Sequence, residues 1–239
     1  MTEWWTYRIG SFLLFSPRTY ARLVEQLHAD LWPLQPLAVA AAVAGLALAW
    51  RACTPMRERV LWAGLAGAWL WVAWAFLHQR FAAINWAAEY VAWAWGAQGL
   101  ALAWVGTVRA RLGWTRRGPA PAARGLRRVP TAALCGTAIA AVALLGWPLL
   151  GRLAGGGWAQ AESFAVLPDP TALATLGFLL LAKRPPWGLF VVPVLSCALG
   201  GAMSWALQAP APGLAPALAG IAVLCAWRGR RAAAAPAVP

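Results

Sequence analysis

Residues Trp62–Val108 read WAGLAGAWLWVAWAFLHQRFAAINWAAEYVAWAWGAQGLALAWVGTV and decide the fold of this chain. The stretch holds two apolar runs joined by the short polar sequence HQRFAAIN, residues 78–85. A helix that crosses a bilayer needs about 20 mostly apolar residues, and each run nearly reaches that length. The stretch therefore predicts two membrane-spanning helices joined by a short polar turn.

The composition of the whole chain supports a membrane protein. Of its 239 residues, 62% are hydrophobic and only 11% are charged, with a mean hydropathy of +0.60. A soluble domain carries about 25% charged residues, so most of this surface must face lipid. We expect one all-α domain, and we expect some of the 18 Trp to anchor at the lipid headgroups.

Seven apolar segments are predicted to span the membrane as a helical bundle. They are residues 34–50, 60–77, 87–108, 130–150, 170–182, 187–207 and 214–227. The fifth is short, and the count becomes six if the fifth and sixth form one re-entrant unit. The predicted organisation is an N-terminal segment over 1–33, a transmembrane domain over 34–227 with a basic loop at 109–129, and a tail over 228–239.

The N-terminal segment is predicted to lie on the membrane surface. Ser16 is a good helix N-cap, and Pro17 is tolerated at the first helical position. One apolar stripe follows at helical spacing, while charged residues fall elsewhere on the helix, so this helix is interfacial rather than spanning. Its stripe is Tyr20, Leu23, Val24, Leu27 and Leu31, and the expected anchors before it are Trp4, Trp5 and Tyr7.

The charge distribution predicts the orientation. The chain has a net charge of +13, but its basic residues lie in loops and at helix ends rather than on one clustered face, which argues against nucleic-acid binding. Strict alternation of the spans places fifteen of the 20 Lys and Arg on one side, in residues 51–59, 109–129, 183–184 and 228–231. Because cytoplasmic loops are enriched in Lys and Arg, we expect a bacterial inner-membrane protein with its N-terminus outside and its C-terminus in the cytoplasm.

This topology gathers several polar residues near the outer membrane face. Asn85 and Glu89 are four residues apart and share a helix face, with His78 just before them and Asp169 on the same side. Polar residues in spanning helices often face the bundle interior and carry function, but these side chains also suit helix ends, which always need polar partners. The candidate ligand-binding residues are Gln35, His78, Asn85, Glu89, Gln98 and Thr171; for Gln98 a helix–helix hydrogen bond is the alternative.

No motif indicates an enzyme, a cofactor or a metal site. The sequence lacks the phosphate-binding glycine loop, the zinc protease motif and the nucleophile elbow. Its four cysteines are scattered and its only two histidines are His28 and His78, whereas zinc sites need clustered ligands. We therefore expect neither catalysis nor a bound cofactor.

Short motifs along the chain resemble an uncharacterised bacterial family of polytopic membrane proteins, domain of unknown function 6064. The resemblance runs from Phe15 to about Trp227, and it implies an inner-membrane location and the same polar residues, but no activity. Leu77 and Asp169 depart from the pattern, where an aromatic residue and a cysteine are expected. The motifs are Trp32-Pro33-Leu34-Gln35, His78 with Phe81, Ile84 and Asn85, Gln98-Gly99, Pro170-Thr171 and Thr175-Leu176-Gly177.

Two functions from different classes remain open. The first is a transporter-like or ligand-binding membrane protein with an outward-facing polar pocket. The second is a non-catalytic structural or assembly subunit of a larger membrane complex, whose Trp-rich and Gly/Ala-rich helices would contact partner proteins or a second copy of the chain. An intramembrane enzyme ranks below both.

Overall fold

The computed structural model describes residues 15–51, 54–109, 112–113, 130–153, 157–183 and 185–234, with side chains described as far as residue 232. Across these residues the chain forms helices and no β-strand, which confirms the all-α class. The expected anchors Trp4, Trp5 and Tyr7 lie outside this part of the chain, as does most of the basic loop 109–129.

Each predicted apolar segment coincides with a helix. α9 continues to Ala234, so the predicted tail from residue 228 begins inside a helix. The helices are α1 Pro17–Leu31, α2 Leu34–Ala49, α3 Pro55–Trp71 continuing as the π-helix η3 Val72–Phe81, α4 Ala88–Ala103 continuing as η4 Trp104–Val108, α5 Thr131–Ala141 continuing through η5 Val142–Gly146 into α6 Trp147–Leu153, the short η6 Trp158–Gln160, α7 Pro168–Leu181, α8 Gly188–Ala206 and α9 Leu214–Ala234.

Fewer helices than the predicted seven are long and apolar enough to cross a membrane. In the described residues three meet that test, Pro55–Phe81, Thr131–Arg152 and Gly188–Ala206, and the pair α1 and α2, bent by 81°, makes a fourth if it counts as one broken span. The others fall short for physical reasons. α7 has only 14 residues, and the last turns of α9 carry arginines.

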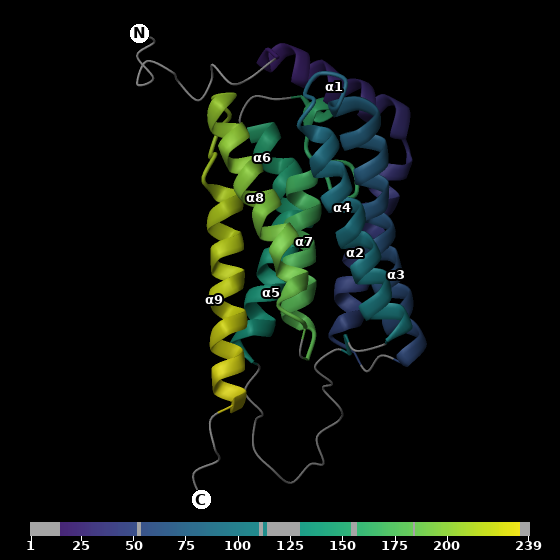
Figure 1. The fold of residues 1–239 in the computed structure, drawn as a ribbon, viewed down its shortest axis with the longest axis vertical. Coiled ribbons are helices and arrows are strands. Elements are labelled where there is room, and N and C mark those ends of the chain that lie inside the picture. The colour runs from purple at the N-terminus through teal and green to yellow at the C-terminus, as the bar shows by residue number, and fades with distance from the viewer. Residues whose placement is uncertain are drawn as a thin grey trace, which may run out of the picture.

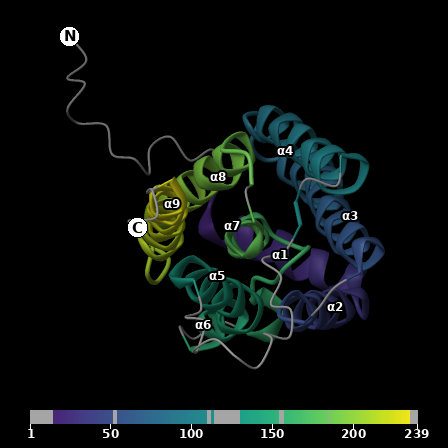
Figure 2. The same ribbon diagram turned by 90° about the horizontal axis from the view of Figure 1, so that it is seen from below.

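The short helix α7 forms the centre of the bundle. Figure 2 shows it surrounded by α2, α3, α4, α5, α8 and α9, and each of its residues from Asp169 to Leu181 is buried. A helix that is apolar on all sides is buried by protein, so α7 need not match the bilayer thickness. α5 approaches it closely, because a Cβ atom on Gly136 or Gly177 would lie 2.6 Å from the carbonyl oxygen of the other glycine.

Tryptophans hold the helices around this centre. The Trp69 Nε1 of α3 donates a 2.7 Å hydrogen bond to the Thr175 Oγ1 of α7, and the Trp69 ring stacks on Trp95 of α4 with centroids 3.8 Å apart. Both rings are fully buried, as is Trp62. Part of the tryptophan content therefore serves packing between helices. The indole N–H groups of Trp62 and Trp69 have acceptors, whereas that of Trp95 has none within the described residues.

The helix α1 lies across one end of the bundle (Figure 1). Its predicted start is confirmed, since the Ser16 Oγ accepts a 3.1 Å hydrogen bond from the Thr19 backbone N–H. Its apolar stripe faces the bundle, with Val24 and Leu27 buried. The Arg80 guanidinium donates a 2.9 Å hydrogen bond to Asp30, tying η3 to α1.

Candidate functional site

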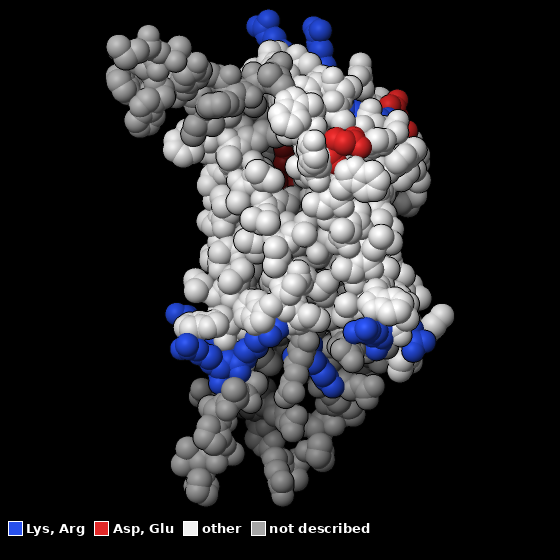
Figure 3. Space-filling model, in the orientation of Figure 1, with Lys and Arg blue, Asp and Glu red and all other residues white. Residues whose placement is uncertain are grey.

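A cavity of about 410 Å³ opens at the end of the bundle where α1 lies. Its walls come from the start of α1, from η3 and the first turn of α4, from the loop before α7, and from the second half of α8. Acidic atoms are visible inside a hollow at this end of the molecule in Figure 3. Two acidic residues, Glu162 and Asp169, line the cavity, which we call the carboxyl cavity.

Asp169 is the deeper of these two acids. It lies in the first turn of α7, is 9% exposed, and has neither a hydrogen-bond nor an ion-pair partner within the described residues. Its carboxylate packs directly on α8 at Gly200, where an added Cβ atom would overlap it. Two neighbours on α7, Pro168 and Pro170, have no backbone N–H to offer it. The glycine on α8 thus makes room for a buried carboxylate that lacks a partner.

Glu162 lies in the loop between η6 and α7, outside the helices of the bundle. Its Oε2 accepts a 2.8 Å hydrogen bond from the Trp147 Nε1. Burial raises the pKa of the Glu162 carboxyl, while the hydrogen bond from Trp147 works in the opposite direction. The carboxyl cavity therefore favours the neutral form of this acid unless a positive charge enters.

Thr171 fixes the loop that carries Glu162. Its Oγ1 donates to the Leu167 carbonyl oxygen at 2.8 Å and accepts from the Ala165 N–H at 2.9 Å. Ala165 has a φ of 59°, a left-handed conformation that is unfavourable for residues with a Cβ. The fully buried Thr171 side chain stabilises this turn, so its place is behind the cavity rather than in its lining.

Aromatic rings form part of the cavity wall. Phe15, Tyr20, Phe76 and Phe81 all line it. The Phe81 ring lies 5.5 Å from Phe76, 5.5 Å from Phe15 and 6.0 Å from Tyr20, centroid to centroid. These distances are typical of interacting aromatic pairs, so the four rings form one continuous cluster beside the two acids.

The structure brings two of the predicted site residues together at the surface. His78 Nδ1 and Glu89 Oε2 are 2.8 Å apart, with side chains 47% and 38% exposed. Asn85 lies in the turn between them and lines the carboxyl cavity, but its Oδ1 accepts a 3.1 Å hydrogen bond from the Ala87 N–H. The pair forms a solvated contact beside the cavity, and Asn85 contributes both to the cavity wall and to the start of α4.

The other predicted residues lie apart from this group. The Gln35 side chain donates a 3.0 Å hydrogen bond to the His28 carbonyl oxygen, across the corner between α1 and α2. Gln98 is buried and donates a 2.9 Å hydrogen bond to the Leu189 carbonyl oxygen, which joins α4 to α8. The helix–helix hydrogen bond expected as the alternative for Gln98 is therefore observed.

Glu162 was not among the predicted site residues, and Asp169 was predicted to lie on the same membrane side without being a candidate. Glu162 lies in a loop without periodicity, so no helical pattern links it to α7. The sequence did contain one indication of a role for Glu162 and Asp169. The chain has only seven Asp and Glu, so an acid within an apolar stretch needs an explanation. In the described residues no three His, Cys, Asp or Glu side chains gather to hold a metal ion.

A comparison of the sequence with known protein families gives a match that covers the whole helical bundle. The sequence matches the "Family of unknown function (DUF6064)" over residues 18–235. The chain belongs to the DUF6064 family. This confirms the resemblance seen in the short motifs, and the match extends from α1 to the end of α9. No curated protein and no solved structure matches the chain.

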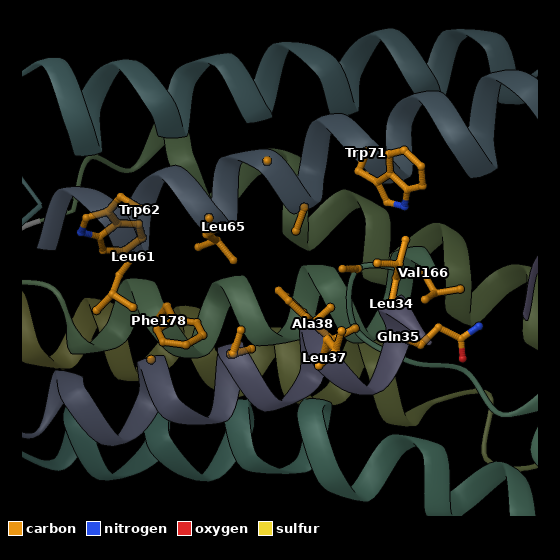
Figure 4. A pocket seen from close by; sticks show the side chains of 18 of the residues that line it. Leu34, Gln35, Leu37, Ala38, Leu61, Trp62, Leu65, Trp71, Val166 and Phe178 are labelled. Atoms are coloured by element: carbon orange, nitrogen blue, oxygen red, sulfur yellow. The ribbon is translucent and has the colours of Figure 1, made fainter. Parts of the chain in front are cut away.

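The DUF6064 bundle has a second, larger opening between α2 and α3. This apolar groove has a volume of about 640 Å³. Figure 4 shows side chains of both helices along it, among them Leu37 and Leu65, with Phe178 of α7 beside Leu61. Gln35 at one end is its only residue with a polar side chain apart from the indoles of Trp62 and Trp71.

Proposed function

We propose that this DUF6064 protein is a polytopic membrane protein that binds a small positively charged solute in the carboxyl cavity and carries it across the bilayer. The observation that supports this most directly is Asp169, a nine-tenths buried acid without a partner among the described residues. A buried carboxylate without a partner costs several kcal/mol. A cationic solute would supply the missing partner.

The charges around the cavity favour the same kind of ligand. Glu25 and Asp30 lie on α1 and Glu89 lies beside the opening, but Arg18 and Arg22 of α1 lie at the same end and Arg80 pairs with Asp30. Among the described residues that line the cavity itself, the charged ones are Glu162 and Asp169, and none is basic. On the face that Figure 3 shows, Lys and Arg form a belt across the opposite end of the bundle, and further basic residues lie at the end where α1 lies. A lining with two acids and no basic residue among its described members attracts cations.

The same belt underlies the proposed orientation. If basic residues mark the cytoplasmic side, the carboxyl cavity opens on the outer face and α9 ends in the cytoplasm. In this proposal α2, α3, α4, α5, α8 and α9 all cross the bilayer around α7, which gives seven spans. α7 and α2 remain shorter than an isolated span because α7 is covered by protein and α2 continues into the surface helix α1. The bacterial plasma membrane stays the predicted location.

Transport requires helices that can change shape next to the ligand, and two are present. η3, which lines the cavity, is a ten-residue π-helix, and π-helical segments are frequent at functional sites. α8 carries Pro193 within the helix and Gly200-Gly201 at the cavity, and Pro and Gly pairs are the usual sites of helix bending. We propose that α8 moves against α7 when the solute passes Asp169.

Cation-dependent stabilisation of the purified protein tests the proposal. Thermal unfolding is measured in detergent with chloride salts of sodium, potassium, ammonium and organic amines, and with neutral sugars and organic anions for comparison. We expect cations to raise the Tm of the wild type and of Glu89→Gln, an exposed acid at the same end, but not of Asp169→Asn. Absence of any cation effect, or an effect that persists in Asp169→Asn, contradicts the proposal. Uptake of the stabilising cation into proteoliposomes then tests transport.

The alternative of a structural subunit has its own supporting observation. Trp86, Tyr90 and Trp93 form an exposed aromatic row along the outer face at the start of α4, at 68%, 70% and 73% exposure. Such a row fits a partner helix as well as the lipid headgroup region. Stoichiometric co-purification of another membrane protein, lost in Trp93→Ala, would favour this function over solute binding.

A further inference from the structure

We infer that the solute of the carboxyl cavity is an organic ammonium ion whose nitrogen carries alkyl groups, bound between the acids of the loop and α7 and the aromatic wall. This inference rests on the proposed function and names its ligand class. It depends on the neighbourhood of Asp169 rather than on the acid alone.

The aromatic wall is the first argument. Phe81 lies at the centre of a cluster with Phe15, Tyr20 and Phe76, and all four rings line the space that Asp169 and Glu162 also line. The face of an aromatic ring carries negative potential and attracts a cation within about 6 Å, and sites for quaternary ammonium groups use such rings. A neutral apolar solute would pack against the aromatic rings but would leave the two acids without a partner, so the combination favours a cation.

The small number of oxygen ligands is the second argument. A hard metal cation such as Ca²⁺ or Mg²⁺ takes about six or more oxygen atoms at fixed distances, and within the described chain no three His, Cys, Asp or Glu side chains form a cluster. The cavity offers the two carboxyls with the side chains of Asn85, Ser196 and Ser204 among mostly apolar residues. An alkylated ammonium ion needs no such shell, because its charge is spread over its methyl groups and it has few or no N–H groups to satisfy.

The size of the cavity is the third argument. Its volume of about 410 Å³ falls within the range of small-molecule sites, about 300–1,000 Å³, and greatly exceeds that of a bare ion. On the side of α8, the Asp169 carboxylate packs against Gly200, and Leu199 and Met203 add apolar surface to the cavity wall. A cation with an apolar body would fill this volume and bury both parts.

A matched ligand series on the wild-type protein tests the inference. Choline is compared with 3,3-dimethylbutan-1-ol, which has the same shape without the charge, and with ammonium and sodium chloride, by titration calorimetry in detergent at constant ionic strength. We expect choline to bind at least tenfold more tightly than the neutral analogue and than either simple cation. Equal binding of choline and the neutral analogue overturns the inference.

Two variants locate the binding, and a third serves as control. Asp169→Asn is expected to weaken choline binding at least tenfold, and Phe81→Leu about three- to tenfold, as the loss of a cation–π contact predicts. Phe178→Leu, the same change at the floor of the apolar groove, should leave choline binding unchanged.

The outcomes separate this inference from the proposed function. If ammonium or sodium stabilises the wild type through Asp169 but choline does not bind, the proposed function stands and the ligand class is wrong. If no cation binds, both are wrong. If Phe178→Leu weakens choline binding as much as Phe81→Leu does, the ligand is not in the carboxyl cavity and the inference is overturned.

Discussion

The carboxyl cavity and the apolar groove are both openings in the surface of one bundle, and both reach α7. The groove is the larger, at about 640 Å³ against about 410 Å³. Its floor is Phe178, near the end of α7, whereas the cavity reaches Asp169 at the start of the same helix. The larger opening is lined by side chains with almost no chemical specificity, and the smaller one holds two acids.

This difference shows why volume is a poor guide to function in a membrane protein. Lipid tails are as apolar as Leu side chains, so a lipid-filled apolar groove between helices costs little. A buried acid without a partner is costly wherever it lies, and it persists only where something offsets the cost. The chemistry of the lining therefore favours the carboxyl cavity as the ligand site, although the groove is larger.

The largest effect on stability is expected from the floor of the groove. Phe178 is 6% exposed and packs inside the bundle, so Phe178→Ala should lower the free energy of unfolding by about 3 kcal/mol through lost packing. Cation binding should not change, since the proposed ligand site lies at the other end of α7. Unfolding by denaturant in detergent micelles, with and without choline, measures both quantities. A loss of binding at unchanged stability would mean that the two openings are coupled through α7.

A matched pair of glycine substitutions compares the openings directly. Gly200→Ala places a methyl group on the Asp169 carboxylate, whereas Gly64→Ala, on α3 at the groove, meets nothing within 4 Å. Alanine favours a helix by about 1 kcal/mol over glycine at both sites. We expect Gly64→Ala to be neutral or stabilising, and Gly200→Ala to destabilise by about 1–2 kcal/mol and to reduce cation binding, because overpacking forces Asp169 to move. Equal Tm values for the two variants would contradict this.

Glu162 makes the cavity sensitive to pH. Because burial raises the pKa of Glu162 above its ordinary value of 4.5, the folded protein holds this proton more tightly than the unfolded chain does. Stability is therefore full below the ordinary pKa and is partly lost as the pH rises from that value through the raised one. Glu162→Gln should flatten this part of the curve of Tm against pH. The Trp147→Phe variant, which removes the hydrogen bond to the carboxylate, should steepen it.

The helices were predictable from the sequence because apolar length is a local property. Each predicted segment lies on a helix, and the Ser16 cap came from a single-residue preference. The central position of α7 was not predictable in the same way. Its 14 residues make it the weakest candidate span by length, yet its burial depends on the packing of α5, α8 and the other helices around it, which no single segment encodes.

The site was predictable only in part, for a related reason. The sequence positions of His78, Asn85 and Glu89 indicated the end of the bundle where the carboxyl cavity opens, and His78 and Glu89 form a 2.8 Å contact there. Asn85 lies in the turn before α4 rather than on a helix face shared with Glu89. Asp169 and Glu162 enter the cavity through a loop with a left-handed turn at Ala165 and through the space left by Gly200. These are tertiary features that helical spacing does not reveal.

The smallest effect is expected at the surface pair that the sequence favoured. The His78 and Glu89 side chains are 47% and 38% exposed, and ion pairs in contact with solvent contribute about 0–1 kcal/mol. Removing both side chains, in His78→Ala with Glu89→Ala, should therefore change the free energy of unfolding by less than about 1 kcal/mol. Any change should shrink further at high salt, which screens exposed charges.

Cation binding to this double variant decides between the two positions for the site. If the ligand lies in the carboxyl cavity, choline affinity should fall no more than about threefold, because only a nearby solvated charge has been lost. A loss as large as that expected for Asp169→Asn would instead place the ligand at the surface pair. The buried acids would then need an explanation within the fold itself, with Asp169 held against Gly200 to fix the packing of α7 on α8.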